Sequence, residues 1–188
     1  MNLIEQALSP NQLKNIFRHH YSGPLRVVEY DEVIRTPNLL TLFSNANFVI
    51  IFYPAAVIEN QTVGHYCALV YHPERNLVDF YDPLAYKPDE YKKFSDRSLY
   101  FERENSLIRH LLTLSNNNFT IDYNHYQHQS RQPNVATCGR HCVLRCLFGE
   151  FTNKQYNKML RVLCKQLKLN PRRLKDELVV TLINFNPH

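Results

Sequence analysis

The sequence predicts an α+β domain in which helices flank a small, mostly antiparallel sheet. Short β-rich runs occupy the middle of the chain, whereas segments with the apolar spacing of helices lie towards both ends. The chain has 188 residues, of which 44% are hydrophobic and 12% aromatic. This is enough for one domain, spanning residues 1–188, with its own core.

The first helix is expected from Pro10 to about Phe17, because Ser9 suits the N-cap and proline suits the first helical position. A buried strand is expected at Phe48 to Tyr53. Outside the central hairpin, the remaining elements are a helix with a leucine face, a short strand and three later helices, expected at about Glu104 to Leu114, Phe119 to Tyr123, Cys138 to Phe148, Thr152 to Leu167 and Pro171 to Ile183.

A β-hairpin is expected in the centre of the chain. Its two strands are Tyr66 to Tyr71 and Leu77 to Tyr81, and the segment from His72 to Asn76 between them is turn-like. We expect Tyr71 to pair with Leu77 across this loop.

This register would bring two residues with catalytic side chains together. His65 would lie opposite Pro83, one position from Asp82, and facing residues of paired strands are ~5 Å apart at Cβ. We therefore expect a hydrogen bond between His65 and Asp82. Asp79 is the rival acid, although it lies in mid-strand.

Cys138 follows a polar loop and precedes a helical pattern that ends at Gly149. A thiol at the start of a helix is favoured as thiolate by the helix dipole, and its own backbone N–H remains free to bind an oxyanion. The carboxamide of Gln132 could supply a second donor, with Gln129 as the alternative.

These residues can fill the roles of a cysteine peptidase. A thiol needs a base to take its proton, a group that orients the base, and donors for the oxyanion. We assign the base to His65, the orienting group to Asp82, the nucleophile to Cys138 and the oxyanion donor to Gln132. The competing interpretation is a structural His–Asp pair beside a core cysteine.

The order of these four residues, with glycine directly after Cys138, resembles the adenovirus-protease (adenain) and SUMO-protease superfamily of cysteine peptidases. The resemblance extends from about Phe48 to Phe148. It implies an adenain-like thiol protease of a virus, virophage or Polinton-type element that cleaves capsid or other virion precursor proteins during particle maturation. It also implies a preference for small residues, often glycine, next to the cut.

The sequence departs from that family at three positions. Tyr66 stands where the family usually has tryptophan, and Asp82 stands where the adenovirus enzymes have glutamate. Aligning Pro133 and Asn134 with the adenovirus enzymes would place Arg131 at the oxyanion position.

Other functions remain open. A protease of SUMO or ubiquitin-like modifiers shares the chemistry, and an acyltransferase could use the same triad. A basic nucleic-acid-binding protein is the alternative from another class. It could hold zinc, because one set of side chains has zinc-ligand types and spacing: His125, His128, Cys138, His141 and Cys142. A closed zinc site would silence the nucleophile, so we expect no metal.

The segment from Phe151 to Lys175 carries eight basic residues and no acidic one. Such a run can be a solvated face or a contact for a phosphate backbone. Adenovirus relatives use DNA as a cofactor, so the resemblance implies the second role. The predicted DNA contacts are Lys154, Lys158, Arg161, Lys165 and Lys168.

Five cysteines without a disulfide pattern, and an N-terminus without the layout of a signal peptide, indicate an intracellular, reducing compartment. The viral resemblance implies the cytoplasm or nucleus of an infected cell and the virion. The longest apolar stretch, Phe48 to Ile58, contains Pro54 and is too short to span a bilayer. We expect a monomer that acts on a protein substrate away from membranes. Its chemistry requires no cofactor, although DNA or an activating peptide could regulate it.

Overall fold

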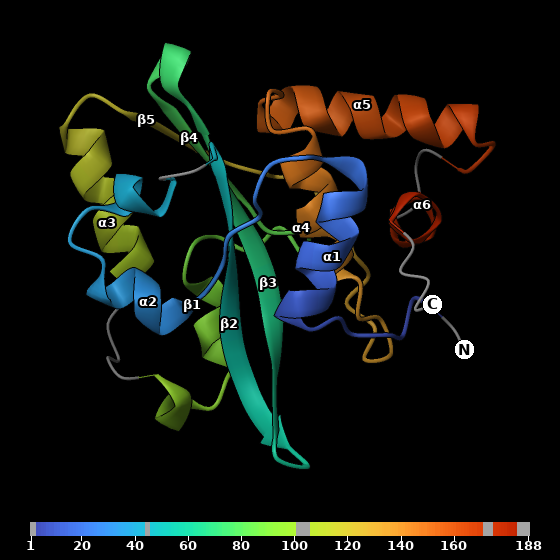
Figure 1. The fold of residues 1–188 in the computed structure, drawn as a ribbon, viewed down its shortest axis with the longest axis horizontal. Helices are drawn as coiled ribbons and strands as arrows, with labels where there is room; N and C mark the ends of the chain where they lie inside the picture. The colour runs from blue at the N-terminus through green and yellow to red at the C-terminus, as the bar shows by residue number, and fades with distance from the viewer. Residues whose placement is uncertain (1–2, 44–45, 101–105, 171–174, 184–188) are drawn as a thin grey trace.

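The computed structural model describes residues 3–43, 46–100, 106–170 and 175–183. Its centre is a five-stranded sheet in the order β1-β2-β3-β4-β5, visible edge-on in Figure 1. The strands are Val27–Glu29, Phe48–Ile58, Gln61–His72, Leu77–Tyr81 and Thr120–Tyr123. The three central strands are antiparallel, and the edge strands β1 and β5 run parallel to their neighbours.

Helices cover both faces of this sheet, and each face has its own apolar core. On one face lie α1, α4, α5 and α6, which pack on residues such as Ile50, Ala68 and Val70. The other face carries α2 and α3 over Ile51 and Leu69. The helices are Pro10–His20, Tyr30–Arg35, Ser106–Asn116, Cys138–Leu147, Asn153–Gln166 and Asp176–Leu182, numbered α1 to α6.

The helix-start signals in the sequence predict the structure well. Ser9 caps α1 through a capping box with Gln12, and Thr152 caps α5 in the same way with Gln155. Helix α4 begins at Cys138, as predicted. The leucine face of α3 is buried, although the predicted start of that helix at Glu104 lies outside the described residues.

Helix α6 begins later than predicted. The expected start at Pro171 lies outside the described residues, and the helix runs from Asp176 to Leu182. Strand β1 and helix α2 were not predicted, because each is short and lacks a periodic pattern of its own. No helix within the described ranges is long and apolar enough to cross a membrane.

The predicted hairpin between β3 and β4 is present, but the predicted register is wrong by one residue. His72, not Tyr71, pairs with Leu77. The loop contains four residues, because Asn76 adopts the left-handed conformation (φ 46°) that asparagine tolerates and thereby closes a tighter turn. His72 consequently stays in the ladder.

Candidate active site

The corrected register explains how His65 and Asp82 meet. The last β3–β4 pair is Ala68 with Tyr81, so the next position in the ladder sets Asp82 beside Cys67. Cys67 and His65 are two residues apart and point to the same face of the sheet. In the predicted register, Asp82 would have pointed to the opposite face.

His65 and Asp82 form a buried, oriented pair. The distance from His65 Nε2 to Asp82 Oδ1 is 2.9 Å, and the two residues are 3% and 2% exposed. The Leu84 backbone N–H donates to the same carboxylate oxygen at 2.7 Å. Asn124 holds the Asp82 backbone from the other side, accepting from its N–H and donating to its carbonyl, each at 2.7 Å. Asp82 is therefore held through both its side chain and its backbone.

The predicted nucleophile, which joins His65 and Asp82 in the site, comes from the start of α4. Cys138 is the first residue of this helix, and the interaction of its thiol with the His65 ring raises the pKa of that ring. Since Nε2 of His65 binds Asp82, the Nδ1 atom remains for the thiol. Helix α1 packs closely here, because a Cβ at Gly139 would lie 2.8 Å from a methyl group of Leu13. Glycine after the cysteine thus allows α1 to support the start of α4.

The electrostatics of the pair favour a charged imidazole. Burial lowers the pKa of His65, but the Asp82 carboxylate and the hydrogen bonds to Asp82 and Cys138 outweigh it and raise the pKa to about 10. The imidazolium form therefore dominates at neutral pH. A neighbouring imidazolium and a helix N-terminus are the two features that stabilise a thiolate.

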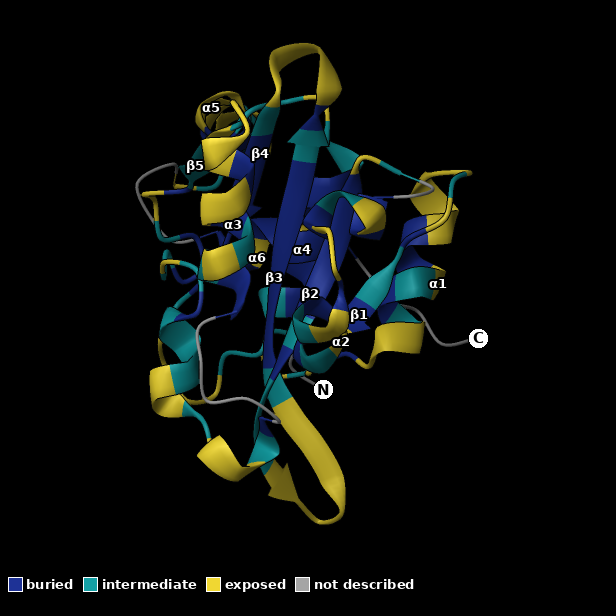
Figure 2. Ribbon diagram, turned by 90° about the vertical axis from the view of Figure 1, so that its left-hand side faces the viewer, coloured by how far each residue is buried: buried dark blue, intermediate teal, exposed yellow. Residues whose placement is uncertain are grey.

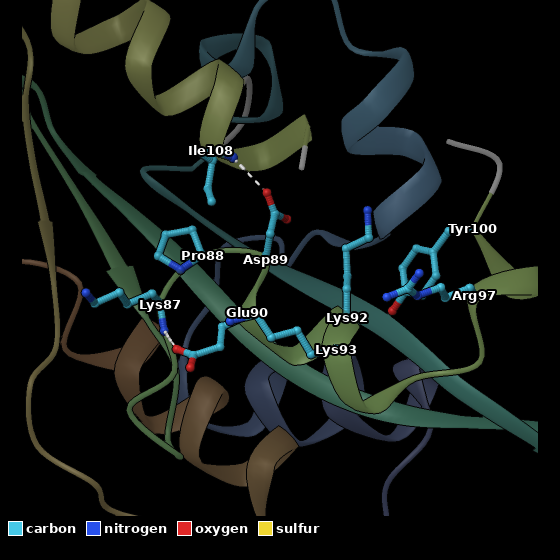
Figure 3. A pocket seen from close by; sticks show the side chains of 9 residues that line it. All are labelled: Lys87, Pro88, Asp89, Glu90, Lys92, Lys93, Arg97, Tyr100 and Ile108. Atoms are coloured by element: carbon cyan, nitrogen blue, oxygen red, sulfur yellow. Dashed lines mark hydrogen bonds between the residues drawn. The ribbon is translucent and has the colours of Figure 1, made fainter. Parts of the chain in front are cut away.

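Tyr91 supports the face of the His65 ring. The two rings stack with centroids 4.5 Å apart. Tyr91 belongs to the short 3-10 helix η3 (Glu90–Phe94), and Asp89 directly precedes this helix at its N-cap. The Asp89 carboxylate accepts from Tyr30 Oη at 2.6 Å and from the Ile108 N–H at 2.9 Å, and Figure 3 shows the second of these bonds.

The pocket of Figure 3 is a separate space, and His65 is not among the residues that line it. It has a volume of about 520 Å³ and is lined by several basic side chains, among them Lys93 and Arg97. His65 and Cys138 instead line a larger cleft of about 800 Å³. The reactive side chains thus open to the second space.

Both candidate oxyanion donors reach the cleft. Gln132 is exposed, and its backbone N–H donates to Ser130 Oγ at 3.2 Å. Gln129 is buried, and its Nε2 atom donates to the Val135 carbonyl at 3.2 Å. One N–H of the Gln129 carboxamide is thereby engaged, whereas the Gln132 carboxamide has no hydrogen bond among the described residues, so the geometry favours Gln132. Arg131 is held away from such a role, since its guanidinium binds the Leu84 carbonyl at 3.0 Å.

Asp176 fixes the loop that precedes the nucleophile. Its carboxylate accepts from the Ser130 N–H at 2.8 Å, from the Thr137 hydroxyl and from His141 Nε2 at 3.3 Å. Burial raises the pKa of Asp176, but the hydrogen bonds and charge of His141 and the bonds from Thr137 and Ser130 bring it below its usual range. Sequence analysis missed this residue, as it missed Asn124 and Tyr91, because no local pattern marks contacts between distant segments.

Comparison with solved structures identifies the fold. The crystal structure of the ASFV pS273R protease superposes with a TM-score of 0.56 at 8% identity, and the match covers 100% of this chain and 71% of that one. The chain therefore shares the fold of the ASFV pS273R protease. A structure of the SUMO protease Ulp1, with its catalytic cysteine oxidized to a sulfinic acid, aligns over 95% of this chain and 79% of its own, with a TM-score of 0.39 and 14% identity.

Sequence comparison adds one viral relative. "Uncharacterized protein V9" of Sputnik virophage is 29% identical over 155 residues, which make up 80% of this chain and 85% of that protein. No protein-family model matches the chain. The predicted α+β fold, in which helices flank a small sheet, is confirmed, and it is the fold of the ASFV pS273R protease.

Asp79, the rival acid, lies on the other face of the sheet. Asp79 pairs with Val70 in the ladder and binds His72 Nε2 at 3.1 Å and an Arg145 guanidinium nitrogen at 3.0 Å. It is fully buried, and its ladder partner Val70 lies five residues along β3 from His65. Asp79 is thus part of the core beneath α4.

The predicted zinc residues have other partners. Both ring nitrogens of His128 are engaged, Nδ1 by the Tyr81 hydroxyl at 3.0 Å and Nε2 by Asn157 Oδ1 at 3.1 Å. Burial is the main reason why the pKa of His128 falls to about 3. His125 is exposed and packs on the Tyr123 ring. Within the described ranges, no group of three or more His, Cys, Asp or Glu side chains could hold a metal ion.

The predicted DNA contacts are all exposed. They follow one another along α5 and just after its end: Lys154, Lys158, Arg161, Lys165 and Lys168. Their apolar neighbours Tyr156 and Leu160 are buried in the core. One of the basic side chains, Arg161, lies over the Tyr126 ring at 5.7 Å.

Proposed function

We propose that the protein is a cysteine endopeptidase. One observation carries this proposal: a half-buried cysteine at a helix N-terminus lines the same cleft as a histidine whose pKa it raises, and that histidine is itself fixed by a carboxylate at 2.9 Å. The adenain-like fold supports the same reading. Nucleophile, base and orienting group are the three elements that this chemistry requires.

The reaction would begin from a Cys138 thiolate and a His65 imidazolium. The thiolate attacks the scissile carbonyl, a C–S bond forms, and the carbonyl electron pair moves to oxygen. The Cys138 N–H and the Gln132 carboxamide would bind this oxyanion. His65 then gives its proton to the leaving amine, and the C–N bond breaks to leave an acyl-enzyme.

Water completes the cycle. His65, now neutral, takes a proton from the attacking water, and collapse of the second tetrahedral intermediate expels the thiolate. Asp82 keeps the ring oriented and stabilises its charged form throughout. Tyr91 limits ring rotation by stacking on it.

The substrates that we propose are capsid or other virion precursor proteins. The Sputnik virophage relative and the fold shared with the ASFV pS273R protease support a viral setting. A protease of ubiquitin-like modifiers is the alternative substrate class. Incubation with virion precursor proteins of the source element, and with SUMO and ubiquitin C-terminal probes, separates the two classes by the product that forms.

The chemistry itself is tested by the rate at which iodoacetamide labels Cys138 as a function of pH. The other four cysteines are buried, and burial raises the pKa of thiols such as Cys142, so labelling should be selective. We expect fast labelling at mildly acidic pH that is lost in His65→Ala. Slow labelling in both proteins, with and without DNA, would contradict the proposal.

DNA is proposed as a regulatory partner through the exposed basic side chains of α5. Their spacing along one surface suits a sequence-independent, salt-sensitive contact with phosphates. Changing Lys158, Arg161 and Lys165 to Glu should weaken duplex binding and reduce its dependence on salt. A matched charge reversal of Lys87, Lys93 and Arg97, on the other side of the sheet, should have a smaller effect. Equal effects would refute a site on α5.

A further inference from the structure

Arg140 is a buried cation in the first turn of α4. Its side chain belongs to a residue that is 1% exposed, and Figure 2 shows α4 in the colour of buried residues along most of its length. One guanidinium nitrogen donates to the Gln6 carbonyl at 2.7 Å and another to Gln6 Oε1 at 3.1 Å. Both acceptors are neutral, and Arg140 Nε has no hydrogen-bond partner among the described residues. No carboxylate therefore balances the charge of this guanidinium.

A second arginine of the same helix shows the ordinary arrangement. Arg145 is also fully buried, but its guanidinium binds the Asp79 carboxylate at 3.0 Å. A charge taken out of water is costly to the fold unless an opposite charge and hydrogen bonds compensate it. The start of a helix increases that cost for a cation, because the helix dipole is positive there, and the first turn of α4 contains no acidic residue. Arg140 thus stands where only a nearby anion would make it favourable.

The Cys138 thiolate is the anion that can meet this need. Burial lowers the pKa of Arg140, whereas the charge of Cys138, two residues earlier, raises it. Arginine keeps its proton at neutral pH in spite of burial. The two side chains share no hydrogen bond among the described residues, since residues two apart on a helix point to different sides. Their interaction acts through the protein interior, where the low dielectric extends the reach of a charge.

Most other ionisable groups around the thiol are neutral. They come from β3, from η3 and from the next turn of α4, and burial raises the pKa of each: Tyr66, Cys67, Tyr91 and Cys142. The charge of Asp82 is matched by His65, which it binds at 2.9 Å. His65 and Arg140 therefore remain as the cations that act on Cys138.

We propose that Arg140 is the second cation of the reactive centre, and that its buried charge favours the thiolate form of Cys138. This inference rests on the proposed peptidase function and adds one residue to it. His65 gives its proton to the leaving amine, whereas Arg140 keeps its charge throughout the cycle. Arg140 would thus stabilise the thiolate twice, as the attacking group and again when the acyl-enzyme expels it.

The test must separate the charge of Arg140 from its role as an anchor for Gln6. Arg140→Ala would remove both. Arg140→Gln keeps an N–H donor for Gln6 and removes the charge, whereas Arg140→Lys keeps a donor and the charge. Gln6→Leu is the matched control, because it removes the Oε1 acceptor and leaves the charge and the Gln6 carbonyl in place.

The measurement is the rate of iodoacetamide labelling at Cys138 as a function of pH, in which the thiolate displaces iodide and a thioether forms. In Arg140→Gln, the pH of half-maximal labelling should rise by about one unit, because a nearby opposite charge has been lost. The maximal rate should not fall, since a less stabilised thiolate is the better nucleophile. Arg140→Lys and Gln6→Leu should both keep the half-maximal pH of the wild type.

An unchanged half-maximal pH in Arg140→Gln would overturn the inference, and so would an equal rise in Gln6→Leu, because anchoring would then explain the effect. If Arg140→Gln does not fold, the other two variants decide. Wild-type values in both support a charge effect, and a shift in either one contradicts it.

Failure of the peptidase proposal is a different result. It would appear as labelling in His65→Ala that matches the wild type. Loss of labelling in His65→Ala together with wild-type behaviour of Arg140→Gln would leave the peptidase proposal intact and remove only the role of Arg140.

Discussion

Two His–Asp pairs connect β3 to β4 or to the residue directly after it, and they differ in what surrounds them. His65 with Asp82 and His72 with Asp79 both join β3 to the chain of β4, at 2.9 and 3.1 Å, and all four residues are buried. The first pair adjoins a thiol and an open cleft. The second adjoins Arg145, whose guanidinium is also fully buried. The residue types alone therefore do not distinguish the candidate catalytic pair from the structural one; the third partner does.

The two pairs act on opposite ends of one helix. Cys138 begins α4, and Arg145 lies seven residues later, about two turns along it. Arg145 also donates to the Phe148 and Phe151 carbonyls, at 3.1 and 2.8 Å. The structural pair thus anchors the end of the helix whose start meets His65.

The largest effect is expected from Asp79→Ala. This change leaves the Arg145 charge buried and unpaired, which costs about 3–5 kcal/mol of folding free energy. Chemical denaturation measures it. The double variant Asp79→Ala, Arg145→Met should recover most of the loss, because a buried pair replaced by apolar groups is often nearly neutral. No recovery would mean that Asp79 acts mainly through its other partners.

Matched substitutions of the two histidines should separate reactivity from stability. In His65→Gln, labelling of Cys138 by iodoacetamide at pH 6 should fall about 100-fold, because an unassisted thiol is almost fully protonated there. In His72→Gln, the labelling rate should stay unchanged while the free energy of unfolding falls by about 1–2 kcal/mol. A comparable loss of labelling in His72→Gln would erase the distinction between the pairs.

The charge of His65 should make stability depend on pH in the alkaline range. Its pKa is raised to about 10 in the folded protein, against about 6.5 when unfolded. Between these values the folded state binds more protons, so stability is greatest below pH ~6.5 and falls as pH rises through 10, by at most about 1.4 kcal/mol per pH unit. Unfolding free energies of the wild type and His65→Gln over this range should converge. Parallel curves would contradict an imidazolium in the folded state.

The smallest effect is expected from Asn124→Ala. This side chain holds the backbone of Asp82 through two buried hydrogen bonds. Losing them should cost about 1–2 kcal/mol of stability and slow Cys138 labelling several-fold at pH 6, because Asp82 would orient His65 less well. Asn157→Ala, which removes the bond to His128 instead, is the matched control and should leave the labelling rate unchanged.

Local signals in the sequence predicted the parts of the molecule that local chemistry determines. Ser9 and Thr152 mark helix starts because their side chains cap neighbouring amides. The strands of the hairpin follow from their β-rich composition, and the meeting of His65 with Asp82 follows from the short loop between those strands. The catalytic roles of His65, Asp82, Cys138 and Gln132 stay predictions until the chemistry is measured.

Long-range contacts escaped prediction for a physical reason. Asn124 and Asp82 are 42 residues apart, and their bond depends on how β5 returns to the sheet. The register error has a local cause, since a left-handed residue at Asn76 shortens the loop by one position. That single residue decides which face Asp82 occupies, so a correct contact was inferred from an incorrect ladder.

The hydrogen bonds from the loop before Cys138 to Asp176 determine when, during translation, this loop can be fixed. Asp176 lies 39 residues after Thr137, and a growing chain is made from its N-terminus. His65, Asp82 and Cys138 all leave the ribosome before Asp176, the side chain that holds the loop before Cys138 in place. The loop before Cys138 therefore gains these hydrogen bonds only after translation has passed Asp176, when His65, Asp82 and Cys138 have already been made.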